Sequence, residues 1–225
     1  MIGFRVRPIG RRVSAKIVEQ FRPLPTANIS DCMSRLAAAG PRLRPMHSDG
    51  ILVGPAFTVK TRPGDNLLVH KALDMAEQGD VVVVDAGGDL TNSILGEIMA
   101  TYAKSRGIAG IVVNGSIRDS RSIKQSAFPI FAAGTTHRGP SRNGPGEIGY
   151  AIAIDGMVVE PGDLIVADDD GIVCVPFDHV DEVYKAVSSK MAAEQRALAD
   201  IAAGRGMDRA WVDKTLKALG CEIET

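Results

Sequence analysis

Two short runs, the four valines at 81–84 and Gly-Ile-Val-Val at 110–113, constrain the fold of this chain more than any other feature. The first run consists of four valines, and such a run suits a strand that is covered on both faces, as in a parallel sheet. The segment between the runs has the apolar spacing of a helix, and glycines mark the turns on either side of it. A strand, a helix and a second buried strand predict a right-handed parallel crossover.

The helix of this crossover is expected to begin at Thr91, Asn92 or Ser93, because such residues cap helix N-termini. Its apolar stripe would comprise Ile94, Leu95, Ile98, Met99 and Tyr102. Further helices are expected over residues 13–21, 26–39, 66–77, 180–201 and 208–219, with a short one from Ile123. Strands are expected over 51–61, with a break near Gly54-Pro55, and over 128–132, 150–154, 157–159, 164–167 and 172–175. The predicted fold class is therefore α/β, with α/β units leading into antiparallel or mixed β structure.

The composition argues against several classes of protein. The chain of 225 residues has 24% charged residues, a net charge of −1 and a pI near 6.4, so it lacks the basic surface of a nucleic-acid-binding protein. No apolar run approaches the roughly 20 residues that span a bilayer, and the N-terminus lacks the apolar segment of a signal peptide. The three cysteines are scattered, which predicts neither disulfides nor a zinc site and favours the cytoplasm.

Arg118 and Asp119 are the strongest candidates for a functional site. They follow the second buried strand, and ligands of open α/β sheets bind beyond the carboxyl ends of the strands. The arginine can bind a carboxylate with two hydrogen bonds, and the aspartate suits Mg²⁺, which takes only one or two protein carboxylates. Glu97 would add a second acid, and the helix start near Gly96 would offer backbone N–H groups to an anionic substrate. The alternative interpretation is a surface ion pair that caps a turn.

Other motifs favour structural roles. Residues 168–171, Asp-Asp-Asp-Gly, lack the spacing of an EF-hand and are typical of a turn between strands. Residues 85–89, Asp-Ala-Gly-Gly-Asp, lack the glycine pattern and the lysine of nucleotide-binding loops. The histidines show no metal-ligand spacing, and His70 is interpreted as a packing residue. Cys32 and Cys174 are expected in the core.

The spacing of the acids and the arginine resembles that of a known family. Glu97, twenty further residues and then Arg118-Asp119 resemble the signature of the 4-hydroxy-4-methyl-2-oxoglutarate / 4-carboxy-4-hydroxy-2-oxoadipate aldolase family, which includes the regulator of ribonuclease activity A. The resemblance extends over roughly residues 25–200 through the runs Arg-Gly-Pro (138–140), Gly-Pro-Gly-Glu (144–147), Val-Glu-Pro-Gly-Asp (159–163) and Val-Ala-Asp-Asp-Asp-Gly-Ile-Val (166–173).

This resemblance implies a β/β/α swivelling-domain fold with flanking N- and C-terminal helices. We therefore expect one domain over residues 1–225, with a core at about 25–178 and C-terminal helices at 180–220. The resemblance also implies assembly into trimers or hexamers with active sites between subunits.

The family's functional residues map onto the candidate site. By resemblance, Asp119 would bind Mg²⁺ or Mn²⁺, and Arg118 would bind an oxygen of a pyruvate unit. Glu97 would hold a metal-bound water, although many aldolases of the family carry aspartate at this position, and the longer acid would move that water. The backbone N–H groups of Ile98 and Met99 would bind the pyruvyl carboxylate.

The long helix expected over 180–201 carries one anomaly. Steps of seven residues along its apolar stripe give positions 180, 187, 194 and 201, and position 194 is Glu194. One interpretation is that the helix leaves the body there and becomes solvated. The other is that Glu194 reaches a polar pocket of a neighbouring subunit. Because enzymes of the family place a neighbour's glutamate near the metal, Glu194 is the candidate for this catalytic acid.

The resemblance predicts a metal-dependent aldolase. Its substrate would be a 2-oxo-4-hydroxy acid such as 4-hydroxy-4-methyl-2-oxoglutarate or 4-carboxy-4-hydroxy-2-oxoadipate, cleaved to pyruvate and a second oxo-acid. Oxaloacetate decarboxylation passes through the same enolate and is expected as a side activity. The alternative is a non-catalytic protein that binds and inhibits a ribonuclease. Methyltransferase activity, a third label used in the family, is disfavoured because the chain lacks a glycine-rich adenosylmethionine loop.

Overall fold

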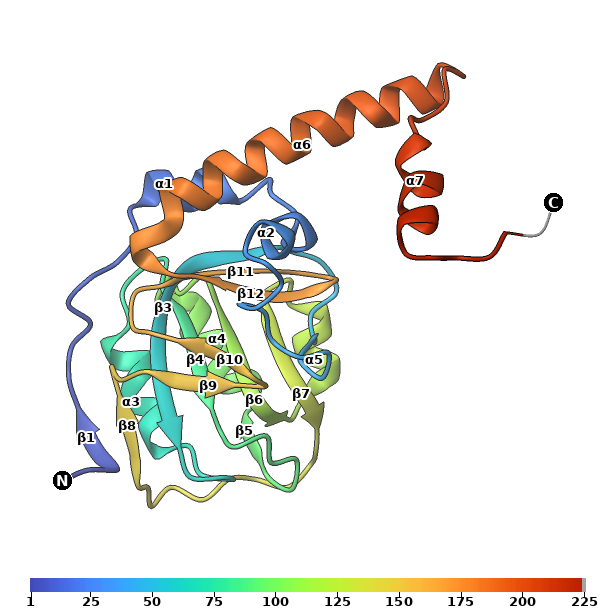
Figure 1. The fold of residues 1–225 in the computed structure, drawn as a ribbon. Coiled ribbons are helices and arrows are strands. Elements are labelled where there is room, and N and C mark those ends of the chain that lie inside the picture. Colours follow the sequence, from blue (N-terminus) through green and yellow to red (C-terminus); the bar gives the residue numbers. More distant parts are fainter. Residues whose placement is uncertain (224–225) are drawn as a thin grey trace. The chain divides into compact units, whose positions relative to one another are not determined.

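The computed structural model describes residues 1–223, and the chain divides into two compact units, Met1–Val187 and Ser188–Thr225. The core expected at residues 25–178 lies wholly within the first unit. The main sheet of that unit has the strand order β1-β8-β3-β4-β6-β7-β2 (Figure 1). These strands span Phe4–Val6 (β1), Gly146–Ile148 (β8), Leu52–Thr61 (β3), Val81–Asp85 (β4), Gly110–Ile117 (β6), Ile130–Thr135 (β7) and Arg44–Pro45 (β2).

The predicted crossover lies in the middle of this sheet. β4 and β6 pair in parallel, with Val81 opposite Gly110 and Asp85 opposite Asn114. The helix between them is α4 (Glu97–Ser105). β4 also pairs in parallel with β3, and β6 pairs in parallel with β7, so neither strand lies at an edge. The prediction of a parallel crossover is confirmed.

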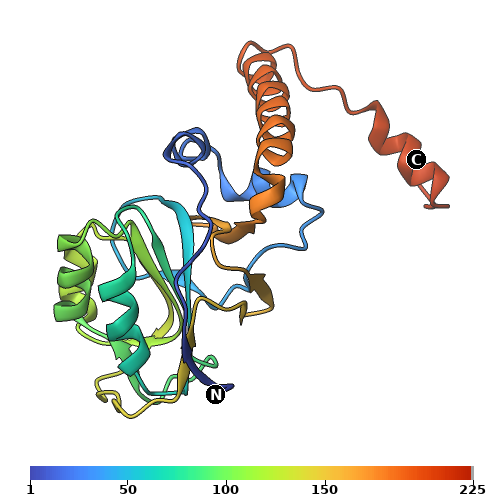
Figure 2. The ribbon, with the colours of Figure 1, turned by 90° about the vertical axis from the view of Figure 1, so that its left-hand side faces the viewer.

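The sheet is covered on both faces (Figure 2). Val82 and Val84 of β4 pack in one core with α3 (Leu67–Met75) and α4. Val81 and Val83 pack in a second core with short strands on the opposite face. Those strands form two antiparallel pairs, β9 (Ile152–Ile154) with β10 (Met157–Val159) and β11 (Leu164–Asp168) with β12 (Gly171–Val175). The molecule therefore has β, β and α layers, and the predicted α/β fold class is confirmed.

The helix of the crossover begins later than predicted. Residues Ser93–Leu95 form a strand, β5, that pairs in parallel with β6. The helix α4 begins at Glu97, so Ile94 and Leu95 are buried as strand residues rather than as part of a helical stripe. Ile98 is 82% exposed, so its predicted place in the stripe is wrong. The apolar residues of this segment span a boundary between a strand and a helix, and their spacing alone imitates one helix.

Two further predictions need correction. The helix expected over 26–39 ends early, as α2 (Thr26–Cys32), because Ser34 and Arg35 adopt positive φ angles of 56° and 62°. The strand expected to break near Pro55 is continuous in β3. Pro55, which has no N–H for the ladder, lies where β3 changes its partner from β11 to β4. The helix α1 (Ala15–Phe21) agrees with the prediction, and α5 (Ser120–Gln125) begins before the predicted start at Ile123. The strands β1, β2 and β8 were not predicted.

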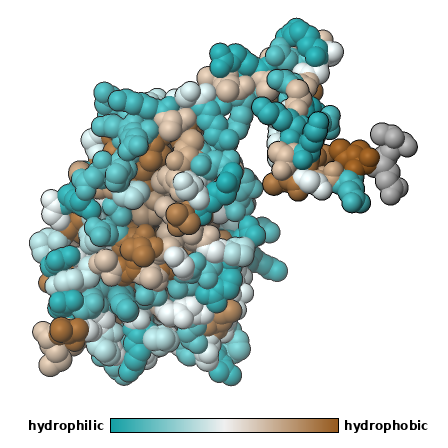
Figure 3. Space-filling model, in the orientation of Figure 1, coloured by the Kyte–Doolittle hydropathy of each residue, from teal (hydrophilic) through white to brown (hydrophobic). Residues whose placement is uncertain are grey.

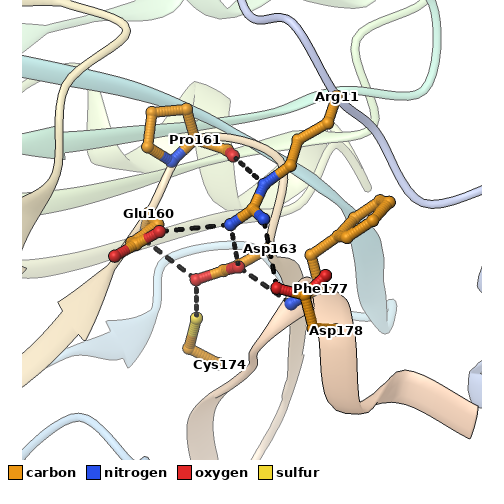
Figure 4. A network of polar contacts seen from close by, with 7 residues as sticks. All are labelled: Arg11, Glu160, Pro161, Asp163, Cys174, Phe177 and Asp178. Atoms are coloured by element: carbon orange, nitrogen blue, oxygen red, sulfur yellow. Dashed lines mark hydrogen bonds and ion pairs between the residues drawn. The ribbon is translucent and has the colours of Figure 1, made fainter.

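The segment before α1 is fixed to the body by polar contacts (Figure 4). Arg11 lies over the ring of Phe177, 5.0 Å from its centroid, and forms an ion pair with Glu160. The buried Asp163 accepts hydrogen bonds from the backbone N–H groups of Glu160 and Phe177 and contacts the thiol of Cys174. Burial and the neighbouring Asp163 carboxylate raise the pKa of the Cys174 thiol well above its ordinary value, so this cysteine is a neutral core residue as predicted.

The second unit contains most of α6 (Val180–Ala202) and the helix α7 (Ala210–Ala218). Both helices agree with the sequence prediction. Several large apolar side chains of this unit are exposed, namely Leu198, Ile201, Met207, Trp211 and Leu219. On the first unit, the face drawn in Figure 3 is mostly hydrophilic, with small apolar patches over the β9–β10 hairpin. Within residues 1–223, no helix is both long and apolar enough to cross a membrane.

Candidate active site

Arg118 and Asp119 lie directly after β6, at the start of α5. The backbone N–H of Arg118 still donates to the carbonyl of Leu95 in β5, at 2.9 Å, so the strand holds the arginine in place. Asp119 then turns the chain with a left-handed backbone (φ 56°, ψ 36°). An aspartate adopts this conformation more readily than most residues, and such outliers gather at functional sites.

The Asp119 carboxylate caps the helix α4 rather than its own helix. Its Oδ2 atom accepts a hydrogen bond from the backbone N–H of Glu97 at 3.0 Å and lies 3.7 Å from Nε of Arg118. Gly96 makes this approach possible, because a Cβ atom built at this position would lie 2.3 Å from Asp119 Oδ2. The two charged side chains remain about 40% exposed. The ion pair and the turn that formed the alternative interpretation are therefore present, but they border a pocket.

The pocket beside this pair has a volume of about 210 Å³. Its walls come from the starts of α3 and α4, the end of β6 and the glycine-rich loop before β8. Its lining residues include Asn66, His70, Ser93, Gly96, Ile98, Met99, Arg118, Asp119, Pro140 and Arg142. The first N–H groups of a helix have no acceptor within that helix, and Ile98 and Met99 carry such groups in α4. The pocket thus combines a helix N-terminus with two arginines, an arrangement that attracts anions.

Asn66 lines this pocket and carries a buried acceptor without a partner among the described residues. Its side chain is 2% exposed and donates through Nδ2 to the carbonyl of Ile94 at 2.9 Å. This bond fixes the orientation of the amide, because a carbonyl oxygen accepts only from the nitrogen side. The Oδ1 atom is buried and, within the described part of the chain, has no hydrogen-bond partner. A buried acceptor without a donor is costly, so this atom suits a ligand hydroxyl or a water.

His70 and Arg142 line the same pocket. The His70 side chain is exposed, but its partial desolvation lowers its pKa, and the positive charge of Arg142 lowers it further, whereas Asp74 opposes the shift. His70 is therefore neutral at pH 7 and can donate or accept one hydrogen bond at each ring nitrogen according to its tautomer. Arg142 remains a fixed positive charge.

A second, wider pocket of about 710 Å³ lies on the other side of Arg118 and Asp119. Its lining is almost entirely polar and includes Glu97, Ser120, Arg121, Thr135, Thr136 and His137. Glu97 lines this pocket and not the smaller one. The structure thus brings Glu97, Arg118 and Asp119 together at one place, with the Glu97 side chain on the open side.

The donor set fits one kind of metal ion. Among the described residues, no group of three or more histidine, cysteine, aspartate or glutamate side chains could hold a metal. Asp119 is partly exposed, and among the residues that the structure describes only Glu97 adds a carboxylate to the same pocket. Such a set fits Mg²⁺ or Mn²⁺, since Mg²⁺ keeps several waters and binds through one or two carboxylates, but it does not fit a structural zinc ion.

Comparison with known proteins identifies the family. The sequence model of the RraA-like family (Aldolase/RraA) matches residues 26–174. The chain belongs to this family. A relative from Halalkalibacterium halodurans, which carries the provisional name 4-hydroxy-4-methyl-2-oxoglutarate aldolase, is 42% identical over 186 residues, covering 81% of this chain and 89% of the relative.

Solved structures agree with this RraA-like assignment. RraAS2 from Streptomyces coelicolor, described as an unusual member of the RNase ES inhibitor RraA family, superposes with a TM-score of 0.76 at 28% identity. That match covers 83% of this chain and 98% of RraAS2. An uncharacterized protein from Pseudomonas syringae superposes with a TM-score of 0.77 at 26% identity, covering 86% of this chain and 95% of that protein.

The other residues that the sequence singled out lie outside the two pockets of this RraA-like chain. Asp168 accepts hydrogen bonds from Thr26 and from the backbone N–H of Asp170, so residues 168–171 form a turn, as the sequence indicated. Glu194 belongs to the second unit, where it forms an ion pair with Lys190 at 3.1 Å and is about half exposed. Its role as an acid supplied to a neighbouring subunit stays a prediction.

Several residues of the RraA-like pocket were not identified from the sequence. Asn66, His70 and Arg142 all line it, and His70 had been interpreted as a packing residue. A weak signal was available for the first two, since the Gly64-Asp65-Asn66 turn follows a strand and opens a helix that carries His70 one turn later. No sequence pattern pointed to Arg142, because the role of an arginine in a loop depends on the residues that it contacts in the folded chain.

Proposed function

We propose that this protein is a divalent-metal-dependent aldolase that cleaves a 2-oxo-4-hydroxy acid to pyruvate and a second oxo-acid. The observation that carries the proposal is the convergence of Arg118, Asp119 and the first turn of α4 on one pocket. The relative named 4-hydroxy-4-methyl-2-oxoglutarate aldolase supports the substrate class. Substrates of this kind, including 4-carboxy-4-hydroxy-2-oxoadipate, carry carboxylates that match the cations of the pocket.

The pyruvyl half of the substrate would bind in the smaller pocket. Its carboxylate would accept hydrogen bonds from the N–H groups of Ile98 and Met99, which the positive end of the α4 dipole favours. Arg118 would donate to an oxygen of the same unit and would stabilise the negative charge that develops on the enolate. Arg142 suits a second carboxylate of the substrate.

Asp119 would hold Mg²⁺ or Mn²⁺ with most of its waters, and Glu97 would bind one of these waters. When bound, the ion would act as a Lewis acid toward the 2-oxo and carboxylate oxygens. Side chains of the protein would carry out the proton transfer. Glu97 would accept the proton of the C4 hydroxyl, directly or through a water, as the C3–C4 bond breaks. The electron pair of that bond passes to C3 and into the enolate of pyruvate, which then takes up a proton at C3.

Oxaloacetate decarboxylation would follow from the same site. Loss of carbon dioxide from C4 leaves its electron pair on C3 and gives the same pyruvate enolate. Because Arg118 and the α4 amides would bind only the pyruvyl end of the substrate, they would stabilise this enolate regardless of the leaving group. We therefore propose oxaloacetate decarboxylase as a side activity.

A coupled pyruvate-release assay tests the proposal. It would compare several 2-oxo-4-hydroxy acids and oxaloacetate, with Mg²⁺ and after EDTA treatment. We expect pyruvate release that EDTA abolishes and that added Mg²⁺ or Mn²⁺ restores, and we expect Arg118→Ala to remove it. Absence of metal-dependent release from every oxo-acid would contradict the aldolase proposal, and unchanged activity of Arg118→Ala would contradict the site.

The second candidate function is inhibition of a ribonuclease. The observation in its favour is the similarity to RraAS2 at a TM-score of 0.76. The intact set of Glu97, Arg118 and Asp119 favours the enzyme, because an inhibitor that only covers another protein does not need an anion pocket. Co-purification of this chain with an endonuclease, together with no pyruvate release, would reverse the ranking.

We also propose a homo-oligomer, a trimer or a hexamer, in which Glu194 of one subunit serves the site of another. The wide pocket at Glu97 and Asp119 is open and polar, so it leaves room for an acid from a second chain. Sedimentation equilibrium would measure the assembly. Mixing Glu194→Gln with Arg118→Ala subunits should restore part of the activity if the site is shared between chains, and no restoration would contradict this arrangement.

A further inference from the structure

The loop before β8 forms one wall of the smaller pocket. It supplies Gly139, Pro140 and Arg142 to the lining, although residues 142–145 have no regular secondary structure. This loop has to be held in place, because a mobile loop would not keep the guanidinium group of Arg142 in a fixed position. We propose that Asp65 is that anchor: it is a positioning residue that holds the loop, and through it Arg142, at the pocket.

The contacts of Asp65 carry this proposal. Its side chain is fully buried, with an exposed fraction of 0%. Its Oδ2 atom accepts three hydrogen bonds from the loop, from Oγ of Ser141 at 2.8 Å and from the N–H groups of Asn143 at 2.7 Å and Gly144 at 3.0 Å. These residues stand on both sides of Arg142. The carboxylate therefore clamps the backbone immediately before and after the arginine.

Asp65 is itself held rigidly. Its Oδ1 atom accepts from the backbone N–H of Leu67 at 3.0 Å, at the start of α3, and its carbonyl accepts from Oγ1 of Thr61 at 2.7 Å. The neighbouring Asn66 donates its backbone N–H to the carbonyl of Ser141 at 3.0 Å. One carboxylate thus joins the start of α3, which carries Asn66 and His70, to the loop that carries Arg142. It ties two walls of the same pocket together.

The charge of this carboxylate is stabilised in place. Burial alone would raise the pKa of the Asp65 carboxyl, but the hydrogen bonds from Asn143, Leu67, Ser141 and Gly144 outweigh burial and lower the pKa below its ordinary value. The group is therefore ionised at neutral pH, and hydrogen bonds to a carboxylate are stronger than those between neutral groups.

The asparagine variant removes this function without changing the size of the side chain. In Asp65→Asn one of the two oxygens becomes an NH₂ group, which only donates. If NH₂ faces the loop, it meets the donors of Ser141, Asn143 and Gly144. If it is turned away, it meets the N–H of Leu67. Either orientation sets donors against donors, so the loop loses its anchor or α3 loses its first-turn contact.

Asp80 offers a matched control. It is also a buried carboxylate, 1% exposed, and it accepts from Nε of Arg12 and from the backbone N–H of Glu77, each at 2.8 Å. It lines neither pocket of the candidate site. Asp80→Asn should therefore lower stability in a similar way while leaving the loop and the pocket unchanged.

The kinetic part of the test rests on the proposed aldolase function. With 4-hydroxy-4-methyl-2-oxoglutarate, we expect Arg142→Gln and Asp65→Asn each to raise KM about tenfold with a smaller change in kcat, and Asp80→Asn to change KM less than twofold. In the Arg142→Gln background, Asp65→Asn should add less than twofold, because its effect acts through the arginine. A full tenfold further loss in that background, or an equal loss in Asp80→Asn, would overturn the proposal.

A second measurement does not depend on turnover. Amide hydrogen exchange of the peptide that covers residues 139–149 should become at least tenfold faster in Asp65→Asn and stay unchanged in Asp80→Asn. Ser141→Ala removes one loop donor and leaves the carboxylate, so it should show a smaller increase even if Asp65→Asn fails to fold. Unchanged exchange in both Asp65→Asn and Ser141→Ala would refute the anchor. A wild-type protein that releases no pyruvate would refute the aldolase proposal alone.

Discussion

Replacement of Gly96 by alanine is the sharpest test of the proposed site. A Cβ atom at this position would lie 2.3 Å from Oδ2 of Asp119 and 2.9 Å from Cγ of Arg118, whereas ordinary contacts begin at 3.4 Å. The Asp119 carboxylate would therefore have to move by about 1 Å, a misplacement that can lower activity about 100-fold. The backbone at Gly96 is extended (φ −145°, ψ −163°) and suits alanine, so the conflict arises from these contacts and not from backbone strain.

The expected result is a folded protein with an impaired site. We expect kcat/KM for pyruvate release to fall about 100-fold and more Mg²⁺ to be needed for half-maximal activity, since Asp119 is the proposed ligand. The shift would also lengthen the 3.0 Å hydrogen bond from the N–H of Glu97 to Asp119. The coupled assay measures turnover against Mg²⁺ concentration, and thermal melting followed by circular dichroism checks the fold.

Two other glycines make the test a graded series. A Cβ on Gly139 would lie 3.2 Å from Nη1 of Arg118, the far end of a flexible side chain, so Gly139→Ala should lower kcat/KM less than about fivefold. Gly10 has no atom within 4 Å of such a Cβ, and Gly10→Ala should have no effect. Wild-type turnover in a folded Gly96→Ala protein would refute the reasoning, because it would show that the positions of Asp119 and Arg118 do not matter.

Two further predictions concern stability. The pKa of His70 is lowered in the folded state, so the unfolded chain binds its proton first and the stability contributed by neutral His70 is lost as pH falls below about 6.5. Because the side chain is exposed, solvent screens this effect and keeps it small. Melting temperatures between pH 7.5 and 5.5 should fall slightly more steeply in the wild type than in His70→Gln, and equal slopes would contradict this. Glu147 accepts from the N–H of Gly3 and from Arg5, and Glu147→Gln should lower the free energy of unfolding in urea by about 1–2 kcal/mol. Glu182→Gln, at an exposed contact with His179, should change it by less than about 0.5 kcal/mol, and equal losses in the two variants would contradict a role for Glu147 in fixing β1.

The central crossover could be predicted from sequence because its signals are local. Four consecutive valines suit only a strand with two buried faces, and the structure divides them between two cores. The start of α4 could not be placed in the same way, since Ser93–Leu95 is fixed as a strand by pairing with β6, more than twenty residues later in the chain. A helical spacing that includes Ile94 and Leu95 cannot reveal this pairing.

The residues of the candidate site likewise include some that local sequence signals predict and some that only contacts across the chain define. Glu97, Arg118 and Asp119 could be predicted because they flank the crossover and match a spacing pattern. Asn66 and Arg142 could not, because each depends on contacts across the chain. Asn66 becomes a pocket residue through its bond to the carbonyl of Ile94, 28 residues away. Arg142 does so through the hydrogen bonds that its loop makes with a carboxylate 76 to 79 residues earlier.

Asp119 has one role that the sequence predicts and a second that only the folded structure shows. From sequence it is a candidate metal ligand, and the structure adds that one of its oxygens caps α4 through the N–H of Glu97. The same carboxylate therefore fixes the helix turn whose residues Ile98 and Met99 line the pocket. Because a cap stabilises the first turn of a helix by about 1 kcal/mol, the proposed cation site and the proposed oxo-acid site are mechanically joined. Binding at either site should order the other, and Gly96 is the residue that permits this contact by leaving space for the carboxylate.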